Sequence, residues 1–233
     1  MSLPFFYEPL LQPNASHINL SEESSKHCIQ VLRMKTGAKL RLTDGKGLLC
    51  SASIAGEDKK KAVAAIEKTE QLPQPAKQVS IAISLLKNIT RLEWFLEKAT
   101  EMGITHIQPL ICQRTEHPRF KQERMEGILV SAMLQSQQCW LPVLAEPMAF
   151  DKYVPASAWQ QKLVAHCEED RKQLLKELPV ADRTEILIGP EGDFTPAEIA
   201  LAIQSGYLPV SLGDTRLRAE TAGMVAAALL VNR

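Results

Sequence analysis

The spacing of apolar and polar residues changes near residue 73. In the first part, residues 39–54 (KLRLTDGKGLLCSASI) follow a strand, turn, strand pattern, and Asp44-Gly45 is typical of a hairpin turn. Residues 60–69 form a third candidate strand, although their alanines also suit a helix. Residues 21–34 predict a short helix that begins at Ser21. The pattern predicts a small β-barrel domain with one helix over residues 1–73.

The second part begins after a linker-like segment, 71–78 (QLPQPAKQ), which has two prolines among polar residues. Candidate strands and helices then alternate. The strands are expected at 79–87, 104–112, 162–167, 185–189 and 207–213. The helices are expected at 90–103, 122–136, from about 170, at 195–204 and at 218–232. This alternation predicts an α/β domain with a mostly parallel sheet over residues 74–233.

One strand-to-helix connection, residues 189–194 within LIGPEGDFTPAEI (187–199), carries two glycines and two acids. Thr195 and Glu198 have the spacing of a capping box, and Pro196 suits the first helical position. In a parallel sheet such a loop lies at the carboxyl ends of the strands, where α/β domains bind ligands. Glycine at 189 and 192 lets backbone amides approach a ligand closely.

A second connection of the same kind lies within 211–223 (SLGDTRLRAETAG). Neither loop matches the glycine-rich dinucleotide or P-loop motifs, so a pyrophosphate ligand is not indicated. Gly223 and Ala226 to Ala228 give the final helix a face of small residues, which suits close helix packing or a subunit interface. Turns of this type also occur in α/β domains without a ligand, so spacing alone leaves a purely structural role open.

The amino-acid composition limits the classes of function that the chain can have. The 233 residues include 27 basic and 27 acidic ones, so no global basic excess indicates a nucleic-acid binder, although a local patch is compatible with this balance. The five cysteines are scattered without CxxC spacing, and the five histidines lack metal-ligand spacing. No apolar run approaches the ~20 residues of a membrane helix, and the N-terminus does not resemble a signal peptide. We therefore expect a cytoplasmic protein with no metal and no membrane partner.

The two loops resemble a known family. IGPEGDFTPAEI (188–199) followed by VSLGDTRLRAETA (210–222) is similar to the RsmE family of the SPOUT superfamily, bacterial enzymes that methylate N3 of a uridine in small-subunit 16S ribosomal RNA. Segments 27–47, 85–104 and 113–115 resemble the family pattern in the same order. Three positions depart from that pattern. They are Asp193 in place of a glycine, Arg216 in place of an aliphatic residue, and Gln138 where the family often has arginine.

The resemblance implies a PUA-like RNA-binding barrel at 1–73 and a SPOUT domain at 74–233 whose C-terminal segment forms a trefoil knot. It also implies S-adenosylmethionine as the cofactor and a homodimer that completes the site. The cofactor-binding residues that we expect are Ile188, Gly189, Pro190, Gly192, Leu212, Gly213 and Leu217. Their glycines would let the first loop wrap the cofactor, and their aliphatic side chains would form an apolar surface beneath it.

Two residues are candidates for catalysis. Arg218 follows the second loop, and its guanidinium could stabilise negative charge on a uracil ring as the N3 proton leaves. Its alternatives are a phosphate contact or an ion pair with Glu220. Glu191 could act near the sulfonium or ribose of the cofactor; a solvated loop acid or a partner of an arginine is the other interpretation. The sequence identifies no general base, and Glu191 and water are the open candidates.

RNA binding is expected from basic residues in two segments, with 16S rRNA in the small subunit as the partner. The candidates are Lys26, Arg33 and Lys35 in the first segment, and Arg114, His117, Arg119, Lys121 and Arg124 in the second. The rival functions are another SPOUT reaction, on a ribose 2′-oxygen or a guanine, and a non-catalytic RNA-binding assembly factor.

Overall fold

A computed structural model describes residues 3–116, 119–168 and 172–232. These residues form two compact units, the first made of 1–74 with 133–141 and the second of 75–132 with 142–233. The sequence placed 133–141 in the second domain, whereas this segment packs with the first unit: the Leu141 amide donates to the Gly45 carbonyl (2.8 Å) and the Trp140 indole to the Pro73 carbonyl (2.9 Å).

The first unit is built on a five-stranded sheet in the order β1-β3-β4-β5-β2. Its strands are β1 (Phe5–Tyr7), β2 (His17–Asn19), β3 (Lys39–Thr43), β4 (Leu48–Gly56) and β5 (Val63–Gln71). The predicted hairpin at Asp44-Gly45 joins β3 to β4, and the Asp44 carboxylate accepts the Lys46 and Leu48 amides. Residues 60–69, the ambiguous segment, are mainly strand. The predicted helix is α1 (Glu22–Lys26), and it continues as a π-helical turn, His27–Val31.

The second unit has an eight-stranded sheet whose strand pairs are all parallel, in the order β11-β13-β10-β12-β6-β7-β8, with β9 also beside β7. Its strands are β6 (Gln78–Ser84), β7 (His106–Ile111), β8 (Val143–Leu144), β9 (Met148–Ala149), β10 (Gln161–Ala165), β11 (Gln173–Leu174), β12 (Arg183–Ile188) and β13 (Leu208–Ser211). β6 and β12 are central and almost entirely buried, which explains why each contains consecutive apolar residues, 81–83 and 186–188, rather than an alternating pattern.

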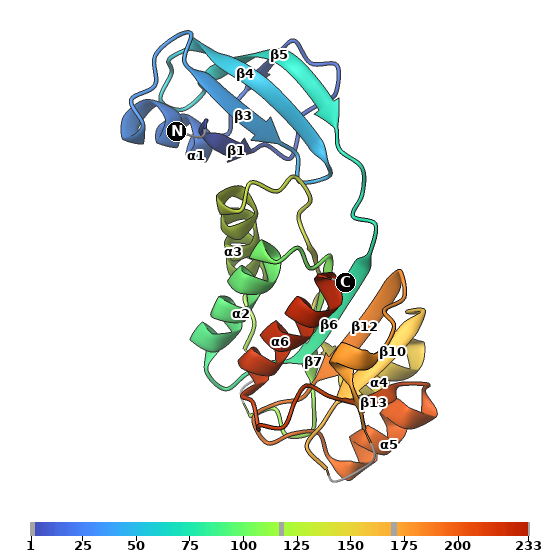
Figure 1. Cartoon of the computed structure of the whole chain (residues 1–233). Helices are drawn as coiled ribbons and strands as arrows, with labels where there is room; N and C mark the ends of the chain where they lie inside the picture. Colours follow the sequence, from blue (N-terminus) through green and yellow to red (C-terminus); the bar gives the residue numbers. More distant parts are fainter. Residues whose placement is uncertain (1–2, 117–118, 169–171, 233) are drawn as a thin grey trace. The chain divides into compact units, whose positions relative to one another are not determined.

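Helices cover both faces of this sheet (Figure 1). They are α2 (Ile89–Glu101), α3 (Gln122–Gln135), α4 (Phe150–Ala156), α5 (Pro196–Gln204) and α6 (Ala219–Val231). α2 and α6 pack together, and α6 lies on β6 and β12; α4 and α5 share the other face, where Phe150, Phe194 and Tyr207 join the core. A Cβ on Gly223 would come within 2.6 Å of the Phe95 ring, so the small residues of α6 serve close packing inside the unit.

The α/β prediction is confirmed, with local differences that include the unpredicted short strands β8 and β9. The polar helix expected from about 170 is wrong: residues 173–177 form β11 and a short 3-10 turn, Leu175–Glu177. The helix α4 was not predicted, because its seven residues are too few to show a helical period. The trefoil knot implied by the family resemblance stays a prediction.

The central strand β12 carries a fully buried acid, Glu185. Its carboxylate accepts hydroxyl groups from Tyr207 (2.6 Å), Ser157 (2.8 Å), Ser80 (3.3 Å) and Tyr153. Burial, followed by the charge of Glu185, raises the pKa of both tyrosines. These bonds provide the partners that a buried carboxylate requires.

Candidate functional site

Three neighbouring parallel strands, β13, β10 and β12, end at the same edge of the sheet, and a cavity of about 650 Å³ opens there. We call it the strand-end cavity. It is lined by Ala165, His166, Cys167, Lys172, Ile188, Gly189, Pro190, Glu191, Asp193, Val210, Ser211, Leu212, Gly213, Asp214, Thr215, Arg216, Leu217, Arg218, Ala219 and Ala222. Its volume lies within the range of roughly 300–1,000 Å³ in which proteins hold small ligands. The carboxyl edge of the sheet is therefore a candidate ligand site, as expected.

The first loop, 189–195, is held in place by Asp193. This residue has a left-handed backbone conformation (φ 63°), which aspartate tolerates better than most residues. Its Oδ1 accepts the Phe194 amide (2.8 Å), and its Oδ2 accepts the Cys167 amide (2.7 Å) from the end of β10. An acid thus occupies the position where the family pattern has glycine, and its carboxylate joins two sides of the cavity.

Arg114 also fixes this loop. Its guanidinium Nη1 donates to the Gly192 carbonyl at 2.7 Å and to the Phe194 carbonyl at 3.4 Å. Arg114 was expected to bind RNA; that role stays a prediction, and the guanidinium bonds show in addition a role in shaping the first loop.

The first loop ends in the predicted capping box. Thr195 Oγ1 accepts the Glu198 amide (3.3 Å), and Glu198 Oε2 accepts the Thr195 amide (2.8 Å). The other oxygen of this nearly buried carboxylate accepts the Gln113 amide at 2.8 Å. The cap therefore also connects the start of α5 to the loop that follows β7.

Gly189 is required by the loop itself. A Cβ there would lie 3.1 Å from the Phe194 amide nitrogen and 3.3 Å from Asp193 Oδ1. The sequence reasoning assigned this space to a cofactor, whereas the loop's own atoms fill it. Gly192 does not line the cavity; its carbonyl faces Arg114 instead.

The second loop, 212–218, has fewer hydrogen bonds. Ser211 Oγ donates to the Gly213 carbonyl (3.0 Å) and accepts the Gly213 amide (3.3 Å). Gly213 has φ 147°, and a Cβ there would meet no atom within 4 Å. α6 then begins after Arg218, whose side chain makes no capping hydrogen bond.

Arg218 lines the cavity and is exposed. The alternative of an ion pair with Glu220 is wrong, because the nearly buried Glu220 carboxylate faces Arg91 of α2, with 3.6 Å between Oε1 and Nε. In the part of the chain that the structure describes, no acid forms an ion pair with Arg218, so its guanidinium is available to a ligand.

Glu191 lies opposite, on the first loop. It is exposed, and its Oε1 accepts the Lys87 amide at 3.1 Å. Within the described ranges no arginine pairs with it, which leaves the second carboxylate oxygen facing solvent or a ligand.

The end of β10 contributes residues that the sequence reasoning missed. His166 and Cys167 line the cavity, and Lys172 Nζ donates to the His166 carbonyl at 2.6 Å. Burial, followed by the charge of Asp193, raises the pKa of the Cys167 thiol, so the thiol form is favoured. In the sequence, only the predicted end of the strand at 162–167 indicates that His166 and Cys167 can reach the site.

Six of the seven expected cofactor-binding residues line the strand-end cavity, the exception being Gly192.

The expected RNA-binding residues do not line the strand-end cavity. Lys26, Arg33 and Lys35 are exposed on the first unit, where Lys35 pairs with Glu57 at 3.2 Å. Arg119 is exposed on the second unit, and His117 lies outside the described residues.

Comparison with known proteins gives two family matches. Residues 73–231 match a model described as an RNA methyltransferase domain, and residues 20–67 match one described as an RNA methyltransferase PUA domain. The ribosomal RNA small subunit methyltransferase E of Synechocystis is 32% identical over 220 residues, covering 91% of this chain and 71% of that protein. The Bacillus subtilis protein of the same name is 27% identical, covering 91% and 88%.

Solved structures agree with these matches. A structure described as a probable rRNA-methyltransferase from Porphyromonas gingivalis has a TM-score of 0.89 and 35% identity, covering 97% of this chain and 95% of that one. A ribosomal RNA small subunit methyltransferase E from Neisseria gonorrhoeae, bound to S-adenosyl methionine, has a TM-score of 0.88 and 26% identity, covering 97% and 96%. Over the described residues, none of the helices is long and apolar enough to cross a membrane.

Proposed function

Because the chain belongs to the family of RNA methyltransferases with a PUA domain that includes ribosomal RNA small subunit methyltransferase E, we propose that it methylates N3 of a uridine in 16S rRNA, with S-adenosylmethionine as the methyl donor. The observation that carries this proposal is the strand-end cavity, in which the two loops quoted from the sequence lie side by side.

The cavity suits this cofactor chemically. Ile188, Leu212 and Leu217 supply apolar surface for an adenine ring, and the loop backbones supply hydrogen-bonding groups for its edge. Phosphate-binding motifs are absent from both loops, and S-adenosylmethionine has no phosphate. Glu191 and Asp193 place carboxylates in a site for a cofactor that carries a sulfonium and an ammonium group.

The bound cofactor would supply an electrophilic methyl group to the uracil nitrogen, and the protein's contribution is positioning and charge stabilisation. Loss of the N3 proton spreads negative charge to the ring oxygens, and the N–C bond would form as the S–CH3 bond of the sulfonium breaks, so that a neutral thioether leaves. Arg218 lines the strand-end cavity, and we assign to its permanently charged guanidinium the stabilisation of that charge. Glu191, on the opposite loop, is the proposed acceptor of the proton.

Methyl incorporation is the decisive test. Small ribosomal subunits from cells that lack this protein should accept labelled methyl groups from S-adenosylmethionine, and mass spectrometry of the digested 16S rRNA should place the label on N3 of a single uridine. Label on a ribose or a guanine would replace this assignment with another reaction of the superfamily, and cofactor binding without methyl transfer would favour an assembly factor.

We also propose a cytoplasmic homodimer formed through α6. Gly223, Ala226 and Ala227 are buried within the unit, while Val225 and Leu229, on the other side of the helix, are apolar and only half-buried. A helix with apolar residues all round is normally covered on both sides. Light scattering at micromolar concentration should give twice the chain mass of 25.9 kDa, and a monomer mass would refute the dimer.

A further inference from the structure

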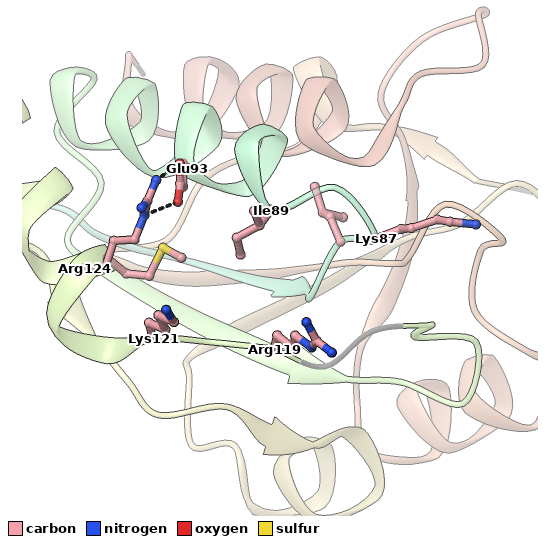
Figure 2. Close-up of a pocket in the computed structure, with 8 residues that line it drawn as sticks. Lys87, Ile89, Glu93, Arg119, Lys121 and Arg124 are labelled. Carbon is pink, nitrogen blue, oxygen red and sulfur yellow. Dashed lines mark hydrogen bonds and ion pairs between the residues drawn. The ribbon is translucent and has the colours of Figure 1, made fainter.

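A second cavity, of about 460 Å³, lies in the same unit between the start of α2 and the segment that precedes α3. We call it the basic groove. It is lined by Leu86, Lys87, Ile89, Glu93, Arg119, Lys121, Arg124 and Met125. Figure 2 shows Ile89 and Glu93 on α2, with Arg119 and Lys121 on the opposite side. Its volume is that of a site for one small organic group, within the roughly 300–1,000 Å³ of ligand pockets.

Some of the basic side chains that line the groove form ion pairs with acids, and others do not. Glu93 neutralises Arg124 through two hydrogen bonds, 2.5 Å to Nε and 3.0 Å to Nη2, and Lys87 pairs with Glu116 at 2.6 Å. Arg119 and Lys121 are exposed, and among the described residues no acid forms an ion pair with either. One side of the groove therefore presents two cations that can bind an anion.

The other side of the groove is apolar. Leu86 and Met125 are nearly buried, and Ile89 leaves 37% of its surface exposed at the groove. Arg124 lies beside them with its guanidinium oriented by the bidentate Glu93 pair (Figure 2). Unstacked RNA bases stack on arginine guanidinium planes of this kind and can pack between apolar side chains, while cations bind the phosphate.

We infer that the basic groove binds one nucleotide of the RNA substrate that lies next to the target uridine, with its base on Ile89 and Arg124 and its phosphate on Arg119 and Lys121. This inference rests on the proposed function and adds a substrate subsite to it. A free anion would not use the apolar side, and an apolar peptide would leave the two cations unpaired.

The groove and the strand-end cavity are neighbours. Lys87 lines the groove, Glu191 lines the cavity, and the Lys87 amide donates to the Glu191 carboxylate at 3.1 Å. A single-stranded RNA segment that places one base at the cavity can therefore place an adjacent nucleotide in the groove.

The test measures RNA binding and methylation separately. The double variant Arg119→Ala/Lys121→Ala is compared with Lys152→Ala/Lys176→Ala, which removes the same charge from two exposed lysines outside both cavities. Equilibrium binding to unmodified small subunits is measured from 50 to 300 mM salt, chosen to span roughly the physiological range. Calorimetry with S-adenosylmethionine checks that each variant still forms the strand-end cavity.

We expect the groove variant to raise the subunit Kd about tenfold or more and to lower the steepness of its salt dependence by about 0.7, the value for one phosphate on a single strand. Ile89→Ala should raise Kd or KM without changing the salt dependence, because it removes only a base contact. The control variant should keep the subunit Kd and its salt dependence at wild-type values.

The inference is overturned if the groove variant and the control behave alike, or if Ile89→Ala dissociates the dimer in light scattering, which would make the groove a contact between copies. Failure of the proposed function has a different signature: wild-type protein would bind subunits, with the groove contribution intact, yet transfer no methyl group.

Discussion

The two loops of the strand-end cavity are alike in sequence and differ in how they are held. Each follows a parallel strand, β12 or β13, crosses a glycine-containing turn and begins a helix. The first loop is bonded by Arg114, by the Asp193 carboxylate and by the capping box at Thr195. The second loop is bonded chiefly through Ser211 and Gly213, and α6 begins without a side-chain cap.

Because of this difference, we expect the two loops to have different roles in the site. A loop whose carbonyl and amide groups already have partners is preorganised, so little conformational entropy is lost when it binds a ligand. The second loop keeps Arg218 exposed and outside any ion pair with a described residue, which leaves its charge available for the reaction. We therefore expect changes in the first loop to alter cofactor affinity and changes in the second to alter turnover.

The largest effect is expected at Arg218. Arg218→Lys keeps the charge but loses the planar fork, and the loss of one such transition-state contact costs roughly 2.7–4 kcal/mol, about 10²–10³ in rate. Both kcat and kcat/KM should fall while cofactor affinity stays near wild type. The measurement is methyl incorporation into unmodified small subunits at several salt concentrations. A normal kcat with a raised KM that varies with salt would make Arg218 a phosphate contact instead.

A smaller effect, confined to binding, is expected at Gly189. Valine there places atoms against the Phe194 amide, and overpacking of this kind costs about 1–3 kcal/mol. Cofactor affinity should fall about 5- to 150-fold or become undetectable in calorimetry. Gly127→Val is the control, because a Cβ at 127 meets no atom within 4 Å. Unchanged affinity in folded Gly189→Val protein would remove the first loop from the cofactor site.

The smallest effect is expected at Asp193. Asparagine tolerates the same left-handed backbone but has one acceptor oxygen, so either the Cys167 or the Phe194 amide loses its partner. One hydrogen bond contributes about 0.5–1.5 kcal/mol, so cofactor Kd should rise about 2- to 12-fold. The kcat should stay at its wild-type value. A lower kcat with normal Kd would show that the first loop also takes part in turnover, and the division between the loops would fail.

The sequence predicts those features of the structure that depend on residues close together in the chain. The capping box follows from Thr195 and Glu198 alone, and Gly103, just after α2, has the left-handed conformation that favours glycine (φ 89°). Most strands were located because buried parallel strands are continuous apolar runs. Short elements such as α4 and β11 have too few residues to display a period.

Contacts between distant residues were not readable. The bond from Gln113 to Glu198 and the bonds from Arg114 to the first loop join segments about 80 residues apart. No spacing rule in the sequence relates such positions, so Arg114 was predicted only as an RNA-binding cation. Gly189 was predicted as a cofactor-binding residue; the atoms that exclude a side chain there belong to Phe194 and Asp193, and their position needed coordinates to identify.

The position of β6 between β7 and β12 has a consequence for how the protein is made. β6 pairs with residues 183–188, about 100 positions later, and the strand-end cavity also needs the beginning of α6 at Arg218, about 30 positions later still. Non-local parallel pairing of this kind is slow to form, and chains are synthesised from the N-terminus. The nascent chain therefore cannot complete its ligand site until β12, the second loop and the beginning of α6 have all left the ribosome.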